Sequence, residues 1–162
     1  MRVLGVDPGL ATIGLGVVIT SSPHDIRLEE WLLLRTKAGL GMGDRLAEIH
    51  HDLTQYLRER QPDLAVVEKL FFETNVKTAM DVAQARGVIL LTLRQAAIPL
   101  LEVTPLQVKS AITGDGKADK RQVQDMVMRM LNLAERPGDD AADALAMAAY
   151  GALHTHTSLA FS

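Results

Sequence analysis

The sequence contains no cysteine and few aromatic residues, with one tryptophan, two tyrosines and three phenylalanines among its 162 residues. The lack of cysteine excludes disulfides, thiolate-bound zinc and cysteine nucleophiles. No apolar run reaches the length of a membrane-spanning helix. The N-terminal segment MRVLGVDPG also lacks the cleavage pattern of a signal peptide. We therefore expect a cytoplasmic protein with no membrane partner.

The chain also lacks a strong charge of either sign, because 17 basic and 20 acidic residues give a net charge of −3. Such a balance gives no overall sign of nucleic-acid binding. The charge is uneven, however, since residues 69–121 contain eight Lys or Arg against five Asp or Glu, a local +3. A positive face is therefore compatible with the mildly acidic composition.

Hydrophobic patterning predicts a single α/β domain large enough to bury a substantial core. The predicted strands cover residues 2–7, 13–20, 25–37, 64–68 and 98–103. The predicted helices cover 42–60 and 75–96, begin after the N-caps Thr104 and Asp119, and run from an Asp139 cap to Leu153, which leaves a frayed tail at 154–162. Three early strands followed by alternating helices and strands predict a mixed sheet with helices on both faces.

An aspartate interrupts the first apolar strand, because Asp7 follows VLGV and directly precedes Pro-Gly. Burying a carboxylate costs free energy unless a partner compensates it. One interpretation is a local hydrogen bond between the Asp7 side chain and the backbone of the turn. The other is a functional site. The stretch alone does not favour either interpretation.

Three further acids occupy comparable positions. Glu68 ends the strand at 64–68, and Asp140 and Asp143 share one face of a helix that is otherwise almost entirely apolar. Capping and the helix dipole explain Asp139, and they are an alternative explanation for Asp140. Asp143 lies one turn inside the helix, where a carboxylate needs a partner.

Strand ends and a helix can bring these four carboxylates to one edge of the sheet. Like charges at close range raise one another's pKa, and they ionise more readily if divalent cations lie between them. Oxygen ligands without Cys or His favour Mg²⁺ or Mn²⁺ over zinc. Two such ions about 3.5–4 Å apart can activate a water and stabilise the leaving oxygen of a phosphodiester. Scattered acids without a shared function are the alternative.

Five motifs occur in the order seen in the RuvC family of bacterial Holliday-junction resolvases, which this sequence resembles over residues 1–153. They are GVDPG at 5–9, Glu68 with Phe-Phe at 71–72, QARG at 84–87, GDGKADK at 114–120 and DAADALA at 140–146. The resemblance implies an RNase H-like nuclease domain with a five-stranded mixed sheet flanked by helices, followed by a flexible tail at 154–162.

The resemblance also implies that Asp7, Glu68, Asp140 and Asp143 are the catalytic, metal-binding acids. It implies a homodimeric endonuclease that uses Mg²⁺, or Mn²⁺ in its place, with two ions per active site. Such an enzyme nicks two strands of like polarity symmetrically across a four-way DNA junction, in recombination and repair. A branch-migration complex is a further partner that the resemblance implies.

Several residues are candidates for contact with DNA, and each has a plainer alternative. An exposed Phe71 would stack on unpaired bases, whereas a buried one would pack in the core. Arg86 would hold a phosphate or, alternatively, order the surface of its helix. The other candidates would contact phosphates or, alternatively, form a solvated basic loop: Lys109, Lys117, Lys120 and Arg121.

Two other classes of function share part of this pattern. Actin-like phosphotransferases open with a similar strand, aspartate and hairpin, but they need two lobes around a nucleotide, and this chain is long enough for one. A non-catalytic junction-binding module would gain nothing from acids that repel phosphates.

The helix at 75–96 is the candidate dimer interface, because Ala79, Ala83 and Gly87 recur every four residues. Packing against the chain's own sheet is the alternative.

Overall fold

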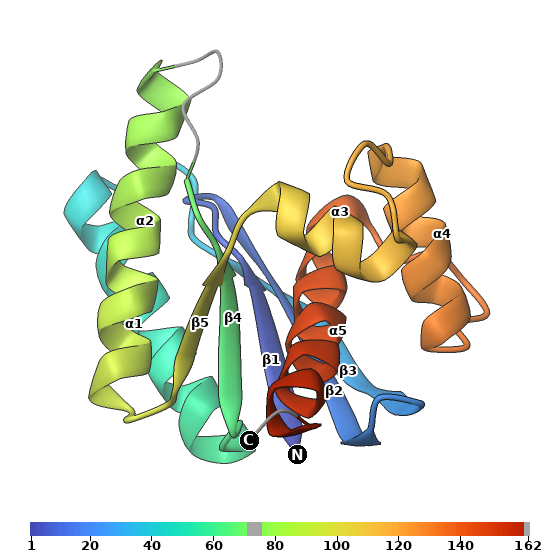
Figure 1. Cartoon of the computed structure of the whole chain (residues 1–162). Helices are drawn as coiled ribbons and strands as arrows, with labels where there is room; N and C mark the ends of the chain where they lie inside the picture. Colours follow the sequence, from blue (N-terminus) through green and yellow to red (C-terminus); the bar gives the residue numbers. More distant parts are fainter. Residues whose placement is uncertain (71–75, 161–162) are drawn as a thin grey trace.

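The computed structural model describes residues 1–70 and 76–160, the last four of them by their backbone alone. Within these residues the chain forms one five-stranded sheet and five helices (Figure 1). The strands are β1 (Arg2–Asp7), β2 (Thr12–Ser22), β3 (Asp25–Arg35), β4 (Leu64–Glu68) and β5 (Leu100–Val103). The helices are α1 (Met42–Arg60), α2 (Val76–Gln95), α3 (Pro105–Thr113), α4 (Lys120–Met130) and α5 (Asp139–Ala160).

The sheet is mixed, as the sequence predicts, and its strand order is β3-β2-β1-β4-β5. The first three strands form antiparallel hairpins, and β4 and β5 then join parallel to β1. The register pairs Val6 with Val67, one residue before Asp7 and Glu68. Because β1 and β4 are parallel neighbours, Asp7 and Glu68 lie at the same edge of the sheet.

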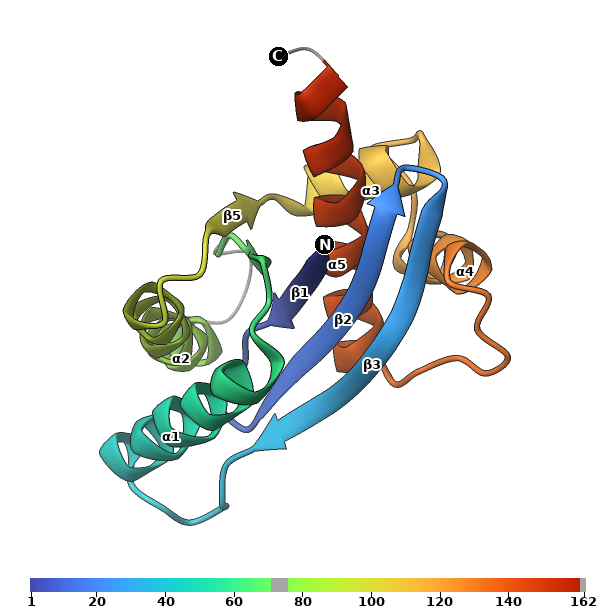
Figure 2. The ribbon, with the colours of Figure 1, turned by 90° about the horizontal axis from the view of Figure 1, so that it is seen from below.

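Helices cover both faces of the sheet, which confirms the predicted layers (Figure 2). α5 crosses one face and packs with α3 and α4, while α1 and α2 cover the other. Alternation along β1 serves both cores, because Val3 faces the α5 side and Leu4 and Val6 face the α1–α2 side. Both cores are dominated by aliphatic side chains, whose burial drives the assembly of the layers.

Two glycines allow α5 to lie directly against the strands. A Cβ added to Gly5 would lie 1.9 Å from the backbone oxygen of Ala144, and one added to Gly14 would lie 2.1 Å from that of Asp140. No side chain fits against backbone at such distances. Gly14 also pairs with Asp7 across the β1–β2 ladder. The first turn of α5 is therefore placed beside the end of β1.

Two of the predicted helix caps are confirmed. Thr104 and Asp119 each accept a hydrogen bond from the backbone three residues later, and Gln107 and Gln122 complete the two capping boxes. The prediction for Asp139 is wrong. Ala142 donates to the Gly138 carbonyl, so that Asp139 is the first helical residue rather than the cap.

The C-terminal segment also differs from the predicted frayed tail, because α5 continues through His154 to Ala160. The ring of His154 stacks on Tyr150 at 5.6 Å between centroids, and His156 Nε2 lies 2.9 Å from the Thr20 hydroxyl oxygen on β2. The contact with Thr20 ties the extra turns to the sheet, and the stacked rings lie on one face of the helix itself. None of the helices in the described part of the chain combines the length and apolar character needed to cross a bilayer.

Candidate active site

The four predicted acids converge on the edge of the sheet where β1 and β4 end. Asp7 and Glu68 are the last residues of these two strands. Asp140 and Asp143 lie at the start of α5, which Gly14 admits beside Asp7. The carboxyl groups of Asp7 and Asp140 are hydrogen-bonded, and Asp7 is within range of the charges of Asp143 and Glu68. Acids from three distant segments of the chain thus form one cluster.

Burial and mutual repulsion perturb these carboxyl groups strongly. Burial, followed by the negative charges of Asp143, Asp140 and Glu68, raises the pKa of Asp7 to about 8. Burial is also the main cause that raises the pKa of Glu68 and of Asp143. Asp7 is therefore protonated at neutral pH unless a cation compensates its charge. Carboxyl groups with such perturbed pKa values in a cleft indicate a functional site.

Two lysines line the cleft above the acids. Lys120, the first residue of α4, places its Nζ 2.9 Å from Asp143 Oδ2 and 3.4 Å from Asp139 Oδ2. Lys109 of α3 lines the same cleft, together with Glu68, Lys120 and Asp143. Both lysines lower the pKa of Glu68 and so oppose the effect of burial. Carboxylates and amines therefore share a cleft of the kind that can hold a phosphate beside a metal site.

The chemistry of the donor set fits a hard divalent cation. All four acids offer oxygen ligands, and burial raises the pKa of Asp7, Glu68 and Asp143, so that a bound cation would favour their ionised forms. In residues 1–70 and 76–160, no three acidic or histidine side chains already surround one point closely enough to hold an ion. Lys120 instead contacts Asp143. Binding of a cation there requires the carboxylate side chains to reorient toward the ion. It also requires Lys120 to release Asp143.

The other predicted site residues differ in their placement. Lys117 and Arg121 are exposed on the α3–α4 loop and the first turn of α4. Arg86 is turned inward and donates to the Glu68 carbonyl and to the Glu102 carboxylate. Phe71 lies outside the described residues, so its predicted stacking role stays a prediction.

Sequence reasoning missed two residues near Glu68. Leu106 on α3 has an exposed fraction of 62%, and with Lys109 and Gly116 it lines a hollow that adjoins Glu68. Glu102 pairs with Arg86 at the end of β5. A polar residue in the apolar stretch IPLLEV was the available signal for Glu102.

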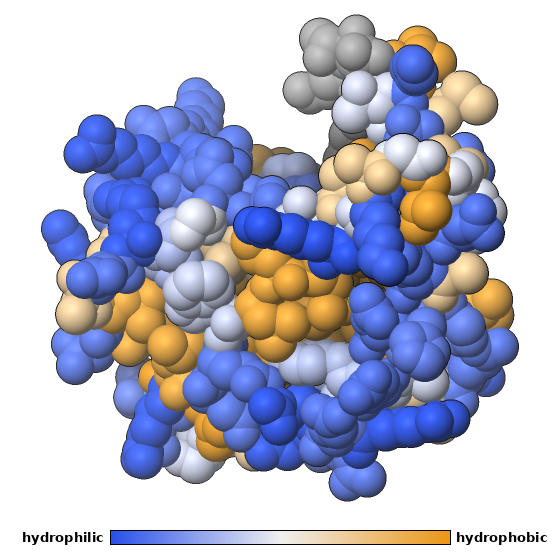
Figure 3. Space-filling model, turned by 180° about the vertical axis from the view of Figure 1, so that it is seen from behind, coloured by the Kyte–Doolittle hydropathy of each residue, from blue (hydrophilic) through white to orange (hydrophobic). Residues whose placement is uncertain are grey.

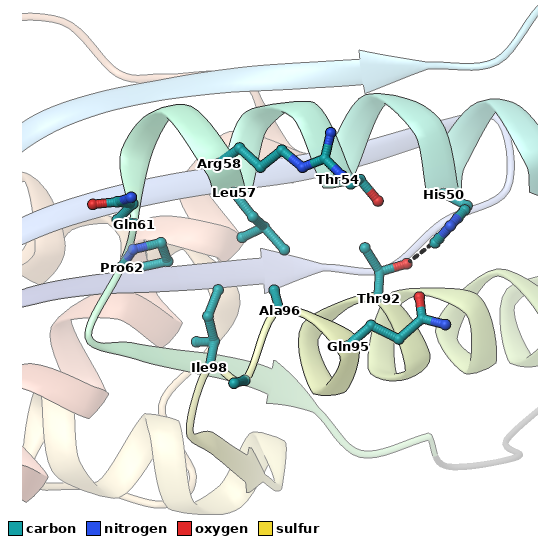
Figure 4. Close-up of a pocket in the computed structure, with 11 residues that line it drawn as sticks. His50, Thr54, Leu57, Arg58, Gln61, Pro62, Thr92, Gln95, Ala96 and Ile98 are labelled. Carbon is teal, nitrogen blue, oxygen red and sulfur yellow. Dashed lines mark hydrogen bonds between the residues drawn. The ribbon is translucent and has the colours of Figure 1, made fainter.

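A separate pocket lies between α1 and α2, at the opposite edge of the sheet (Figure 4). It is lined by residues just before β4 and β5, such as Pro62 and Ile98, and by His50 and Thr54 of α1. His50 Nδ1 lies 2.9 Å from the hydroxyl oxygen of Thr92. None of the predicted site residues lines this pocket.

Comparison with known proteins decides the family. The family described as "Crossover junction endodeoxyribonuclease RuvC" matches residues 3–150. The chain belongs to the RuvC family. The RuvC proteins of Chloroflexus aurantiacus and Thermomicrobium roseum are 51% and 49% identical to it over 149 residues, 91% of this chain and 90% of each relative. Membership confirms the predicted resemblance and the nuclease class.

Solved structures of RuvC proteins and other resolvases share the fold. A structure of T. thermophilus RuvC in complex with Holliday junction substrate is similar with a TM-score of 0.91 and 33% identity, over 98% of this chain and 96% of that chain. A yeast mitochondrial Holliday junction resolvase is similar in fold alone, with a TM-score of 0.68 and 16% identity. The predicted RNase H-like fold is thereby confirmed.

Proposed function

We propose that this RuvC-family chain acts in the cytoplasm as a homodimer that nicks two strands of like polarity symmetrically across a four-way DNA junction. Mg²⁺, for which Mn²⁺ can substitute, is held by Asp7, Glu68, Asp140 and Asp143. The observation that carries this proposal is the cluster of four partly buried carboxyl groups beside two lysines. The similar T. thermophilus protein, solved with a Holliday junction substrate, supports the choice of DNA.

A pair of divalent cations, when bound, supplies an activated water and stabilises the charge on the leaving oxygen. The residues of the chain do the rest. Asp7, whose pKa is about 8 in the metal-free cluster, would release its proton to solvent when a cation is bound. Lys120 moves from Asp143 toward the scissile phosphate, and Lys109 contacts the same phosphate group from α3.

The exposed basic residues extend this contact along the DNA backbone. Lys117 and Arg121 lie on the loop and helix start next to Lys120, where they can reach flanking phosphates. Such contacts position the DNA without reading its sequence. Phe71 stacks on a base at the crossover in this proposal. Arg86 points inward, and its role is argued separately below.

A homodimer supplies the second active site that paired cuts require. A two-fold interface repeats every site across its axis, and each chain has one acid cluster. α2 presents the surface for it. Its residues Val76, Met80 and Leu91 have exposed fractions of 73%, 57% and 54%. Figure 3 shows apolar side chains among polar ones along α2, at the upper right beside the grey atoms. A branch-migration complex remains a further proposed partner, by family resemblance.

The alternative functions are distinguished by one experiment. The chain is incubated with a synthetic four-way junction and with a linear duplex, in Mg²⁺, in Mn²⁺ and in chelator. We expect paired cuts in the junction alone, with either metal and not with chelator. Binding without cutting would favour the non-catalytic module. Within the described residues there is one sheet, so the two lobes of an actin-like phosphotransferase are not present.

A further inference from the structure

Arg86, halfway along α2, is held at the active-site end of the sheet. Its Nε donates a 2.8 Å hydrogen bond to the main-chain oxygen of Glu68. Its Nη2 donates to the carboxylate of Glu102 on β5, which forms an ion pair. The Arg86 side chain has an exposed fraction of only 14%. One guanidinium group therefore joins α2 to the ends of two adjacent strands.

The carbonyl that Arg86 binds belongs to the residue whose carboxylate is a proposed metal ligand. Within the sheet, β5 also holds the end of β4. Glu68 pairs with Val103, and the backbone N–H of Lys69 donates to the Val103 carbonyl at 2.7 Å. Beyond Lys69 the chain leaves the sheet. Arg86 is thus the side chain that fixes the last peptide of β4 from the helical layer. Small displacements of a ligand or reacting group cost large factors in affinity and rate.

The helix around Arg86 is itself firmly placed. Two of its neighbours are fully buried against the sheet: Ala85, directly before Arg86, and Ile89, almost one turn after it. The planar guanidinium donates in two directions at once, and a lysine ammonium at the end of a flexible stem cannot reproduce that fork. Because two of its nitrogens are engaged within the protein, the geometry does not favour contact with a DNA phosphate.

We propose that Arg86 is a positioning residue of the nuclease site. It holds the carboxyl end of β4 to α2 and β5, and it thereby keeps the Glu68 side chain where a metal ion can use it. This inference rests on the proposed function for its effect on cutting. Its effect on metal binding does not depend on the identity of the DNA substrate.

The test compares Arg86→Lys and Arg86→Gln with the wild type in the full-length protein. The protein is titrated with Mn²⁺ in the absence of DNA. The electron paramagnetic resonance signal of the free ion reports how much Mn²⁺ stays unbound. We expect both variants to weaken Mn²⁺ binding about 10-fold, the usual cost of losing a group that orients a ligand. Arg60→Gln is the matched control, because Arg60 pairs with Glu30 far from the acids; its Mn²⁺ affinity should equal that of the wild type.

Two further measurements separate positioning from phosphate contact. Junction affinity in chelator, and its dependence on salt, should be unchanged in both Arg86 variants. A phosphate contact would instead make the log–log salt slope of Arg86→Gln shallower by about one, and Arg86→Lys would restore it. That pattern overturns the proposal, as does wild-type Mn²⁺ affinity in both variants. If Arg86→Gln does not fold, the Mn²⁺ affinity of Arg86→Lys decides: a loss of about 10-fold is expected, and wild-type affinity overturns the proposal.

Failure of the proposed function is seen separately. A wild type that binds Mn²⁺ but leaves the junction intact would remove the nuclease assignment, while the Mn²⁺ affinities would still decide the role of Arg86.

The Glu102→Gln variant removes the ion pair with Arg86 and leaves the hydrogen bond from Arg86 Nε to the Glu68 carbonyl. We expect its Mn²⁺ affinity to fall less than that of Arg86→Gln, and an equal fall would assign the effect to the ion pair instead.

Discussion

Lys120 Nζ and Asp143 Oδ2 lie 2.9 Å apart, which gives a carboxylate in the proposed metal site a cationic partner from the chain itself. Burial raises the pKa of Asp143, and Lys120 opposes this effect through its hydrogen bond and its charge. Lys120 therefore competes with a metal ion for this acid. In the proposed mechanism, the amine of Lys120 would contact the phosphate once a cation has replaced it beside Asp143.

The competition predicts opposite effects of Lys120→Met on metal binding and on cutting. Mn²⁺ affinity should rise about 5-fold, the factor that ~1 kcal/mol gives for a partly exposed ion pair. Cutting at saturating metal should fall, because the phosphate loses a contact. Lys117→Met removes an exposed charge from the neighbouring loop and serves as the control for the Mn²⁺ titration, in which no DNA is present. Weaker Mn²⁺ binding by Lys120→Met in a direct titration would contradict the competition.

The acid cluster predicts a separation of binding from cutting. Asp7→Asn, Glu68→Gln and Asp143→Asn should each abolish cutting and leave junction binding largely intact, because these side chains hold metal and repel phosphates. Asp140→Asn should behave similarly but more mildly. Parallel gel-shift and cleavage assays measure both properties.

Asp139→Asn is the matched control for these variants. Asp139 is adjacent to Asp140 and also contacts Lys120, but its side chain is 76% exposed. It should therefore retain cutting. Loss of binding in step with loss of cutting, in variants that fold, would refute the assignment of the four acids.

The raised pKa of Asp7 predicts an unusual dependence of folding stability on pH. Since folding raises the pKa of Asp7 from 3.8 to about 8, its protonated form favours the folded state. This contribution is complete below about pH 4 and is lost as the pH rises through about 8. In chelator, Asp7→Asn should therefore melt above the wild type at pH 9, by about 3 °C or more for each ~1 kcal/mol. The difference should shrink toward pH 5.

Thermal melts between pH 5 and pH 9 measure this effect. Asp139→Asn should show no such gain, because hydrogen bonding to Gln124 and the charge of Lys120 lower the pKa of Asp139. Saturating Mg²⁺ should raise the melting temperature of the wild type and reduce the advantage of Asp7→Asn. A wild type as stable as Asp7→Asn at pH 9 in chelator would show that the acids do not repel one another in the folded state.

Local sequence signals were sufficient for much of this architecture. The helix predicted at 42–60 and the strand predicted at 64–68 match α1 and β4 at both ends. The strong apolar periodicity of α1 and the break at Pro62 explain this agreement. Asp7 and Glu68 stood out because each is an acid at the end of a buried apolar strand.

The remaining features depend on contacts between residues far apart in sequence. The extension of α5 to Ala160 accompanies a hydrogen bond between His156 and Thr20, 136 residues away. The inward orientation of Arg86 depends on Glu102, which only the packing of α2 beside β5 brings within reach. The start of α5 depends on local sequence, because the Gly138 carbonyl accepts from Ala142, whereas the preference of aspartate for N-caps favours the adjacent Asp139.

The small residues of α2 lead to a prediction about assembly. Gly87 is exposed, and a Cβ added to it would meet nothing within 4 Å. The buried residues Ala85, Ile89 and Leu93 lie on the opposite side of the helix. Packing of Gly87 against the chain's own sheet, the alternative that the sequence left open, is therefore wrong. The surface around Gly87 is therefore open, and Ala79 and Ala83 on the same face of the helix are partly exposed.

Ala83→Arg should convert the protein into a folded monomer, because a charged side chain in the middle of this face prevents close approach of two helices. The monomer should nick a cruciform plasmid slowly and should not linearise it in one binding event, since paired cuts need two acid clusters. Sedimentation reports the mass, and the ratio of nicked to linear product reports the coupling. His51→Arg adds the same charge on the exposed face of α1 and should stay dimeric and active. An Ala83→Arg protein that remains a dimer and linearises the plasmid would place the interface on another surface.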